Sequence, residues 1–154
     1  MLKTKSDSGF SLLELMLVIA VLVILATIVN GYYFNYLKNT QLDSAGKLVA
    51  SELIKARDKA MAGEADNNWG VHFVNNGSNY YELFSSPTDY FNTAKAVKET
   101  IFLDNGINFA SPTTGASTTV VFSKIFGNST ETGIVLTSDF GSSTISISGQ
   151  GRVE

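Results

Sequence analysis

The sequence predicts an α+β protein in which one long N-terminal α-helix packs against a C-terminal head built on an antiparallel β-sheet. The helix is predicted by an apolar run over residues 10–29 and by small apolar residues that recur every three or four positions from residue 42. The sheet is predicted by short segments beyond residue 67 in which apolar and polar residues alternate between turn-forming residues. Among the 154 residues we therefore expect a leader over residues 1–9, a helix over 10–62 and a single head over 63–154.

The apolar run is long enough to cross a lipid bilayer. Residues 10–29 carry a single charge, and an α-helix of about 20 residues rises about 30 Å, the thickness of the hydrocarbon core. Lys3 and Lys5 precede the run, and positive charges on that side favour a cytoplasmic N-terminus. We therefore expect residues 10–31 to form a transmembrane half of the helix, with the head on the opposite side of the membrane.

Glu14 is the one charge inside the apolar run. A carboxylate within a membrane helix costs about 2.5–3.5 kcal/mol on insertion scales, so it indicates a function. Cleavage between Gly9 and Phe10 would provide a partner, because the new α-amino group of Phe10 would lie one helical turn from Glu14 or within reach of Glu14 on another subunit. A pair of opposite charges costs less to bury than either charge alone.

This arrangement resembles the class III signal of type IV pilins and the related pseudopilins. That signal has a short basic leader, a glycine before the cleaved bond, a phenylalanine after it, and a glutamate at the fifth mature position of an apolar helix. Gly9, Phe10 and Glu14 match it. A Sec signal peptide has a shorter apolar core and a small-x-small cleavage site, which Ala26–Thr27–Ile28 matches poorly, and a plain signal anchor leaves Glu14 unexplained.

The resemblance implies a pilin fold and a processing pathway. It implies cleavage between Gly9 and Phe10 by a prepilin peptidase, N-methylation of Phe10, and a single-pass precursor in the inner membrane whose head is periplasmic or extracellular. It further implies filament assembly with other pilin or pseudopilin subunits at an inner-membrane platform. Residues 10–31 would form the filament core, and Glu14 would neutralise the Phe10 amine of a neighbouring subunit.

The second half of the helix is predicted to be amphipathic. Asn30–Gly31 is a weak point, because glycine costs a helix interior about 1 kcal/mol relative to alanine; local melting on assembly and a continuous helix both remain open. Beyond it, one face carries a narrow stripe of mostly small apolar residues that should pack closely against a sheet. The stripe consists of Leu42, Ala45, Val49, Leu53, Ala56 and Ala60.

About seven short strands are predicted in the head. The first begins at Trp69, Asn76–Gly77 favours a hairpin turn after it, and Pro87 ends the return strand. Residues 88–99 are expected to form a loop or a short helix. The later strands are expected at residues 80–84, 100–103, 107–109, 120–126, 134–137 and 144–148.

Two further stretches are similar to the GspH/FimT-like minor pilins and pseudopilins. Ala56–Arg57 and Ala60 match their Ala-Arg-x-x-Ala helix end, and residues 121–153 are similar to their C-terminal hairpin. The resemblance implies a structural subunit of a type IV pilus-like or type II secretion filament. The alternatives are a DNA-uptake or adhesive minor pilin and a membrane-anchored binding module.

The residues give little support to an enzyme, a metal site or a cofactor site. His72 is the only histidine and the chain has no cysteine, which leaves neither a nucleophile–base pair nor a zinc site. His72 falls on the opposite strand face from Trp69, so we expect it to be exposed or at a rim. Asp104–Asn108 offers oxygen ligands around a glycine but lacks the loop of an EF-hand, so we expect a plain turn there.

The charge balance of the head disfavours nucleic acid as a partner. From residue 67 onward four positive side chains stand against seven negative ones, whereas phosphate binding requires a positive surface. Arg152, beside Glu154, is expected to be a surface or fold residue.

Overall fold

The computed structural model describes the backbone of residues 9–154 and the side chains of residues 9–27 and 36–154. The chain forms two compact units, one ending at Leu37 and the other running from Lys38 to Glu154. A single helix, α1 (Leu12–Met61), supplies the regular structure of the first unit and one layer of the second. Its backbone is helical through Asn30–Gly31, so the continuous helix is the alternative present in the isolated chain.

The transmembrane half expected over residues 10–31 is described in part, since the side chains of residues 28–31 lie outside the described ones. Within the described residues, no helix is both long enough and apolar enough to cross a membrane.

The second half of α1 carries the predicted buried stripe. Leu42 and Ala45 are 5% and 7% exposed, and the other four stripe residues are fully buried. The helix ends at Met61, where the amides of Ala62 and Gly63 donate to the carbonyls of Asp58 and Ala60. Gly63 has φ +66, the left-handed conformation common after a helix end. A short 3-10 turn, η1 (Glu64–Asp66), then leads into the first strand.

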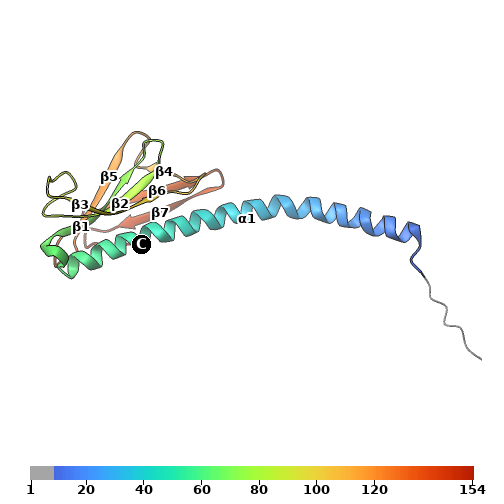
Figure 1. The fold of residues 1–154 in the computed structure, drawn as a ribbon, viewed down its shortest axis with the longest axis horizontal. Coiled ribbons are helices and arrows are strands. Elements are labelled where there is room, and N and C mark those ends of the chain that lie inside the picture. Colours follow the sequence, from blue (N-terminus) through green and yellow to red (C-terminus); the bar gives the residue numbers. More distant parts are fainter. Residues whose placement is uncertain (1–8) are drawn as a thin grey trace, which may run out of the picture. The chain divides into compact units, whose positions relative to one another are not determined.

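The head contains two antiparallel sheets, which confirms the predicted α+β class. Figure 1 shows both sheets on one side of the second half of α1. The four-stranded sheet has the order β3-β2-β1-β5 and the three-stranded sheet the order β4-β6-β7. The strands are β1 (Asn68–Val74), β2 (Tyr80–Ser86), β3 (Ala96–Phe102), β4 (Asn108–Ser111), β5 (Ser117–Phe122), β6 (Thr132–Ser138) and β7 (Gly141–Ile147).

Most strand boundaries differ from the prediction by one to four residues, and the largest differences are at the start of β3 and the end of β5. β3 begins at Ala96, so the last part of the expected loop or helix over residues 88–99 is a strand paired with β2. β5 ends at Phe122 rather than at residue 126. The chain turns there because the amide of Ser123 donates to Asn128 and the amide of Ile125 donates to Ala60 at the end of α1.

Asn75 joins the two sheets from a buried position. Its side chain is 4% exposed, and Nδ2 donates to the carbonyl oxygens of Phe109 and Pro112, each at 2.8 Å. Its backbone also pairs with Gly115 and Ala116 in the segment that leads into β5. One residue therefore satisfies carbonyl groups at the junction between the sheets, where an unpaired carbonyl would be costly.

Gly70 marks the closest approach of strands β1 and β5. A Cβ atom at this position would lie 2.3 Å from the backbone oxygen of Val120 and 2.8 Å from Cζ of Phe84. The backbone oxygen cannot rotate away, so only glycine fits. By contrast, a Cβ at Gly133 in β6 would meet nothing within 4 Å.

Gly70→Ala should therefore destabilise the head by about 1–3 kcal/mol, the usual cost of overpacking a close-packed interior. Gly133→Ala serves as the matched control and should leave stability nearly unchanged, because its methyl group enters open space. Urea unfolding of the two variants and the wild type would measure the difference. Equal stability of the two variants would contradict the assigned close contact.

Candidate functional site

Gly9 and Phe10 directly precede the cap of α1. Ser11 is the N-cap residue: its Oγ accepts a hydrogen bond from the amide of Glu14 at 3.2 Å, and its carbonyl accepts one from Leu15 at 3.2 Å. Ser11-x-x-Glu14 has the spacing of a capping box, a signal that the sequence analysis missed although it is legible in the residues. The predicted cleavage junction thus lies just outside the helix.

Contacts with the rest of the described chain do not explain why residue 9 is glycine or residue 10 is phenylalanine. A Cβ at Gly9 would meet nothing within 4 Å, and the Phe10 side chain is 83% exposed. Packing among the described residues explains neither a small residue before the junction nor an aromatic one after it.

Glu14 occupies the first turn of α1, where the positive end of the helix dipole favours a carboxylate by about 0.3–1 kcal/mol. It is exposed, and no ion pair joins it to another described residue. The structure therefore gives Glu14 a local role in starting the helix, alongside the intersubunit role that the sequence predicts. The two roles need separate tests.

The first turns of α1 are apolar on every side. Thirteen large apolar side chains between Phe10 and Leu25 are each at least 46% exposed. A helix that is hydrophobic all round is normally buried among other helices or in lipid. These side chains are exposed in the described chain, so we take this surface as a candidate contact surface.

His72 is buried, contrary to the prediction of an exposed or rim position. Its side chain is 4% exposed, because the loop between β2 and β3 folds back over that face of the four-stranded sheet. Tyr90 of this loop stacks on the imidazole at 3.6 Å between ring centroids, with 10° between the planes. Nδ1 lies 2.7 Å from Oγ1 of Thr119, and the Tyr90 hydroxyl donates to Glu82 at 2.5 Å.

Burial shifts the pKa values of His72 and Tyr90 in the directions that favour their uncharged forms. Burial lowers the pKa of His72; Lys95 lowers it further, while Glu82 opposes the shift. Burial and the hydrogen bond to Glu82 raise the pKa of Tyr90 well above its ordinary value. The Lys95 ammonium lies 3.5 Å from the Tyr90 ring centroid. Stacked rings and fixed hydrogen bonds make the cluster a packing element of the head.

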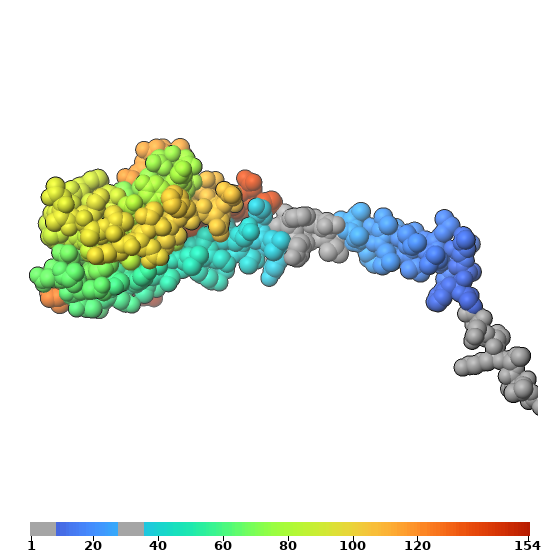
Figure 2. Space-filling model, in the orientation of Figure 1, coloured from blue at the N-terminus to red at the C-terminus, as the bar shows by residue number. Residues whose placement is uncertain are grey.

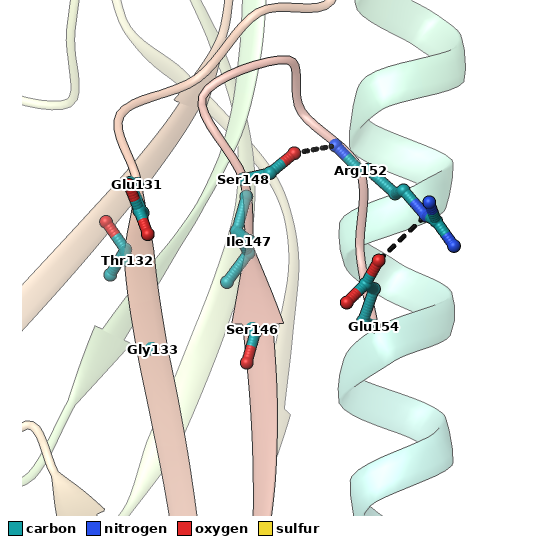
Figure 3. Close-up of a pocket in the computed structure, with 8 residues that line it drawn as sticks. All are labelled: Glu131, Thr132, Gly133, Ser146, Ile147, Ser148, Arg152 and Glu154. Carbon is teal, nitrogen blue, oxygen red and sulfur yellow. Dashed lines mark hydrogen bonds and ion pairs between the residues drawn. The ribbon is translucent and has the colours of Figure 1, made fainter.

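A shallow hollow of about 340 Å³ lies on the outer face of the C-terminal hairpin (Figure 3). Ser146 exchanges backbone hydrogen bonds with Glu154, so the tail continues the sheet beside β7. Small side chains line the centre of the hollow, and charged side chains lie at its rim. The lining residues are Glu131, Thr132, Gly133, Ser146, Ile147, Ser148, Arg152 and Glu154.

The charges of this hollow do not suit a phosphate backbone. Arg152, its one basic side chain, is exposed at the surface and pairs with Glu154, Nε to Oε1 at 2.9 Å. Glu131 adds a second carboxylate to the rim. A surface with two carboxylates and one guanidinium repels polyanions.

The segment Asp104–Asn108 forms the predicted turn. The Ile107 amide donates to the Asp104 carbonyl, Gly106 has φ +89, and the turn joins β3 to β4. It borders a second hollow of about 310 Å³, in which Asn79 donates to Asn108 at 2.7 Å. The described residues include no group of three or more carboxylate, histidine or cysteine side chains that could hold a metal ion.

The pKa of His72 predicts how stability depends on pH. The unfolded chain takes up a proton near the ordinary histidine value of about 6.5, whereas folding lowers the pKa, so stability is full above pH 6.5 and declines as the pH falls toward the lowered value. His72→Gln, which cannot titrate, should remove this decline. Because His72 is the only histidine, unfolding measured at pH 7.5 and pH 5.5 isolates it. An identical decline in the variant would contradict the assignment.

Residues 4–30 match the family model described as the prokaryotic N-terminal methylation motif. The matched segment contains Gly9, Phe10 and Glu14 and the exposed apolar turns at the start of α1. No curated protein and no solved structure matches the chain. The motif, together with the α+β fold, supports a place for this chain in the type IV pilin-like class.

Proposed function

We propose that the protein is a structural subunit of a type IV pilus-like or type II secretion filament. One observation carries the proposal: the N-terminal methylation motif coincides with a helix whose first turns expose twelve large apolar side chains and one carboxylate, Glu14. Such a surface needs lipid or other helices around it. In a precursor held in the inner membrane, lipid would surround this surface. In the assembled filament, the helices of other subunits would surround it.

Processing would occur at the Gly9–Phe10 bond. A prepilin peptidase on the cytoplasmic side would remove residues 1–9, and the new Phe10 amine would be methylated. Two features support this site: the bond lies outside the capped helix, and neither flanking residue is engaged by the described chain. A protease can therefore reach this bond without unwinding α1.

Assembly would place Glu14 of one subunit against the Phe10 amine of its neighbour. The carboxylate lies in an otherwise apolar surface, where an opposite charge is the partner that makes its burial affordable. Pairing at a single charged position would also fix the axial register of neighbouring helices, much as one polar residue fixes register in a coiled coil.

The subgroup that fits best is the GspH/FimT-like minor pilins and pseudopilins. The matching helix end contributes Ala56 and Ala60, both fully buried, to the interface with the sheets. The matching C-terminal segment forms β6, β7 and the paired tail. The acidic rim of the hollow beside Arg152 gives no support to DNA uptake.

Gly9→Val should block removal of the leader while leaving the head folded, because a side chain at residue 9 meets nothing in the described chain. Mass spectrometry of protein purified from a host with its own prepilin peptidase would show the full-length chain for the variant. The wild type would begin at Phe10 and carry one extra methyl group. A wild-type protein that keeps residues 1–9 in such a host would refute the proposed pathway.

Glu14→Gln should be processed normally but incorporated poorly into filaments. Glutamine retains the capping-box residue type and loses the charge, so the variant removes both the intersubunit charge pair and the helix-dipole contribution of about 0.3–1 kcal/mol; the control below accounts for the loss of helix stability. Ser11→Ala is the matched control: it removes the cap, at a cost of about 0.5–2 kcal/mol, and should still assemble. Sheared filament fractions would be compared by immunoblot. Normal incorporation of Glu14→Gln would exclude the charge-pairing role.

A further inference from the structure

The head exposes an apolar surface where α1 ends. The loop over residues 123–128, here named the tip loop, presents Ile125 and Phe126, which are 61% and 74% exposed. Met61, 46% exposed, lies beneath it, 2.8 Å from where a Cβ on Gly127 would stand. In Figure 2 the orange segment that contains the tip loop borders the green end of α1.

The backbone of the tip loop is strained at Ile125. Ile125 has φ +71, a conformation that a β-branched residue rarely adopts and that costs on the order of 1–3 kcal/mol. Its amide donates to the carbonyl of Ala60 at 2.9 Å, which anchors the loop to the helix. This hydrogen bond accounts for the position of the loop backbone but not for the apolar side chains that the loop exposes.

The positively charged side chain of Arg57 lies next to the tip loop. The Arg57 side chain packs under Gly127, with Cγ 3.3 Å from the position of a Cβ there. Its Nε is buried without a hydrogen-bond partner, and no ion pair joins Arg57 to another described residue. The surface made by Arg57, Met61, Ile125 and Phe126 is named the tip patch.

The hairpin turn between β6 and β7 carries the opposite charge and a second exposed ring. Its two loop residues are Asp139 and Phe140; Phe140 is 46% exposed, and no described ion pair involves Asp139. Two-residue hairpin loops favour Asn-Gly or Asp-Gly, so turn geometry does not explain a phenylalanine here. Asp139 and Phe140 together are named the turn patch.

The two patches lie at opposite ends of the head. The tip loop attaches at Ala60, whereas a Cβ on Gly141, next to the turn patch, would lie 3.8 Å from Leu42. These two positions are eighteen residues apart on α1, or about 27 Å along the helix axis. Figure 2 shows the red turn beside the cyan part of α1, away from its green end.

We propose that the tip patch of one subunit binds the turn patch of a second copy. Phe126 and Ile125 would pack against Phe140, and Arg57 would pair with Asp139. Different surfaces at opposite ends of one molecule make a heterologous, head-to-tail contact, which generates an open helical array rather than a closed dimer. The inference rests on the proposed filament function and names the surfaces through which successive heads meet.

The chain has no cysteine, which permits a direct cross-linking test. A double variant, Phe126→Cys with Phe140→Cys, would be expressed with its native assembly machinery, and sheared filaments would be treated with a short bis-maleimide. Each head then carries one thiol at each end. The expected result is a ladder of covalent multimers on a denaturing gel, whereas either single variant can yield nothing larger than a dimer.

Two controls make the test specific. Phe91 is 77% exposed but lies on the loop over β1, so Phe126→Cys with Phe91→Cys should give no ladder. In the double-cysteine background, Arg57→Glu or Asp139→Arg should each reduce the ladder, and the two reversals together should restore it. Arg57→Glu with Glu131→Arg, which alters an exposed acid elsewhere, should not restore it.

The outcomes separate this inference from the function on which it rests. A ladder that depends on both cysteines and is rescued by the paired reversal supports the contact. Filaments of normal yield without a ladder, or a ladder equally strong with the Phe91→Cys pair, overturn the contact and leave the filament function standing. A wild-type protein that is processed but never enters filaments overturns both.

Discussion

Close packing of α1 against the two sheets is set by small side chains, and the rest of the head depends on it. Ala56 and Ala60 are completely buried, and a Cβ at Gly46 would lie 2.7 Å from Oγ of Ser143 in β7. With so little side-chain volume between them, the helix and sheets leave no room for added methylene groups. The same approach lets the tip loop reach the Ala60 carbonyl and complete the helix end.

The two halves of the continuous helix α1 differ in which side chains they bury and which they expose. The second half buries one narrow face and leaves its polar side chains in water, which is how a helix on a globular head behaves. The first half exposes large apolar residues all round and includes a single acid. The core of the head does not cover that surface, and the proposed function supplies its cover from lipid or from the helices of other subunits.

The periodic spacing of apolar residues in the sequence made much of the fold predictable. The features that the sequence did not predict depend on contacts between residues far apart in the chain. The stripe from Leu42 to Ala60 was identified from its spacing alone, and the strand that begins near Trp69 from alternation. The burial of His72 was missed because the residue that covers it, Tyr90, comes from a loop with no period. The role of Asn75 was missed for the same reason: its partners Phe109 and Pro112 lie more than thirty residues away. At the N-terminus, Gly9, Phe10 and Glu14 were legible in sequence, and their processing and pairing stay predictions.

The N-cap at Ser11 has an electrostatic consequence for the mature chain. Before cleavage, Phe10 is followed by the capped helix and preceded by a neutral peptide bond. Afterwards a cationic amine would stand at the positive end of the helix dipole, a repulsion of about 0.3–1 kcal/mol. Leader removal would thus add an unfavourable charge at the start of α1, which the carboxylate of Glu14 would offset, either within the same chain one turn further on or from a neighbouring subunit. Cleavage would in this way change the electrostatics of the helix start as well as shorten the chain.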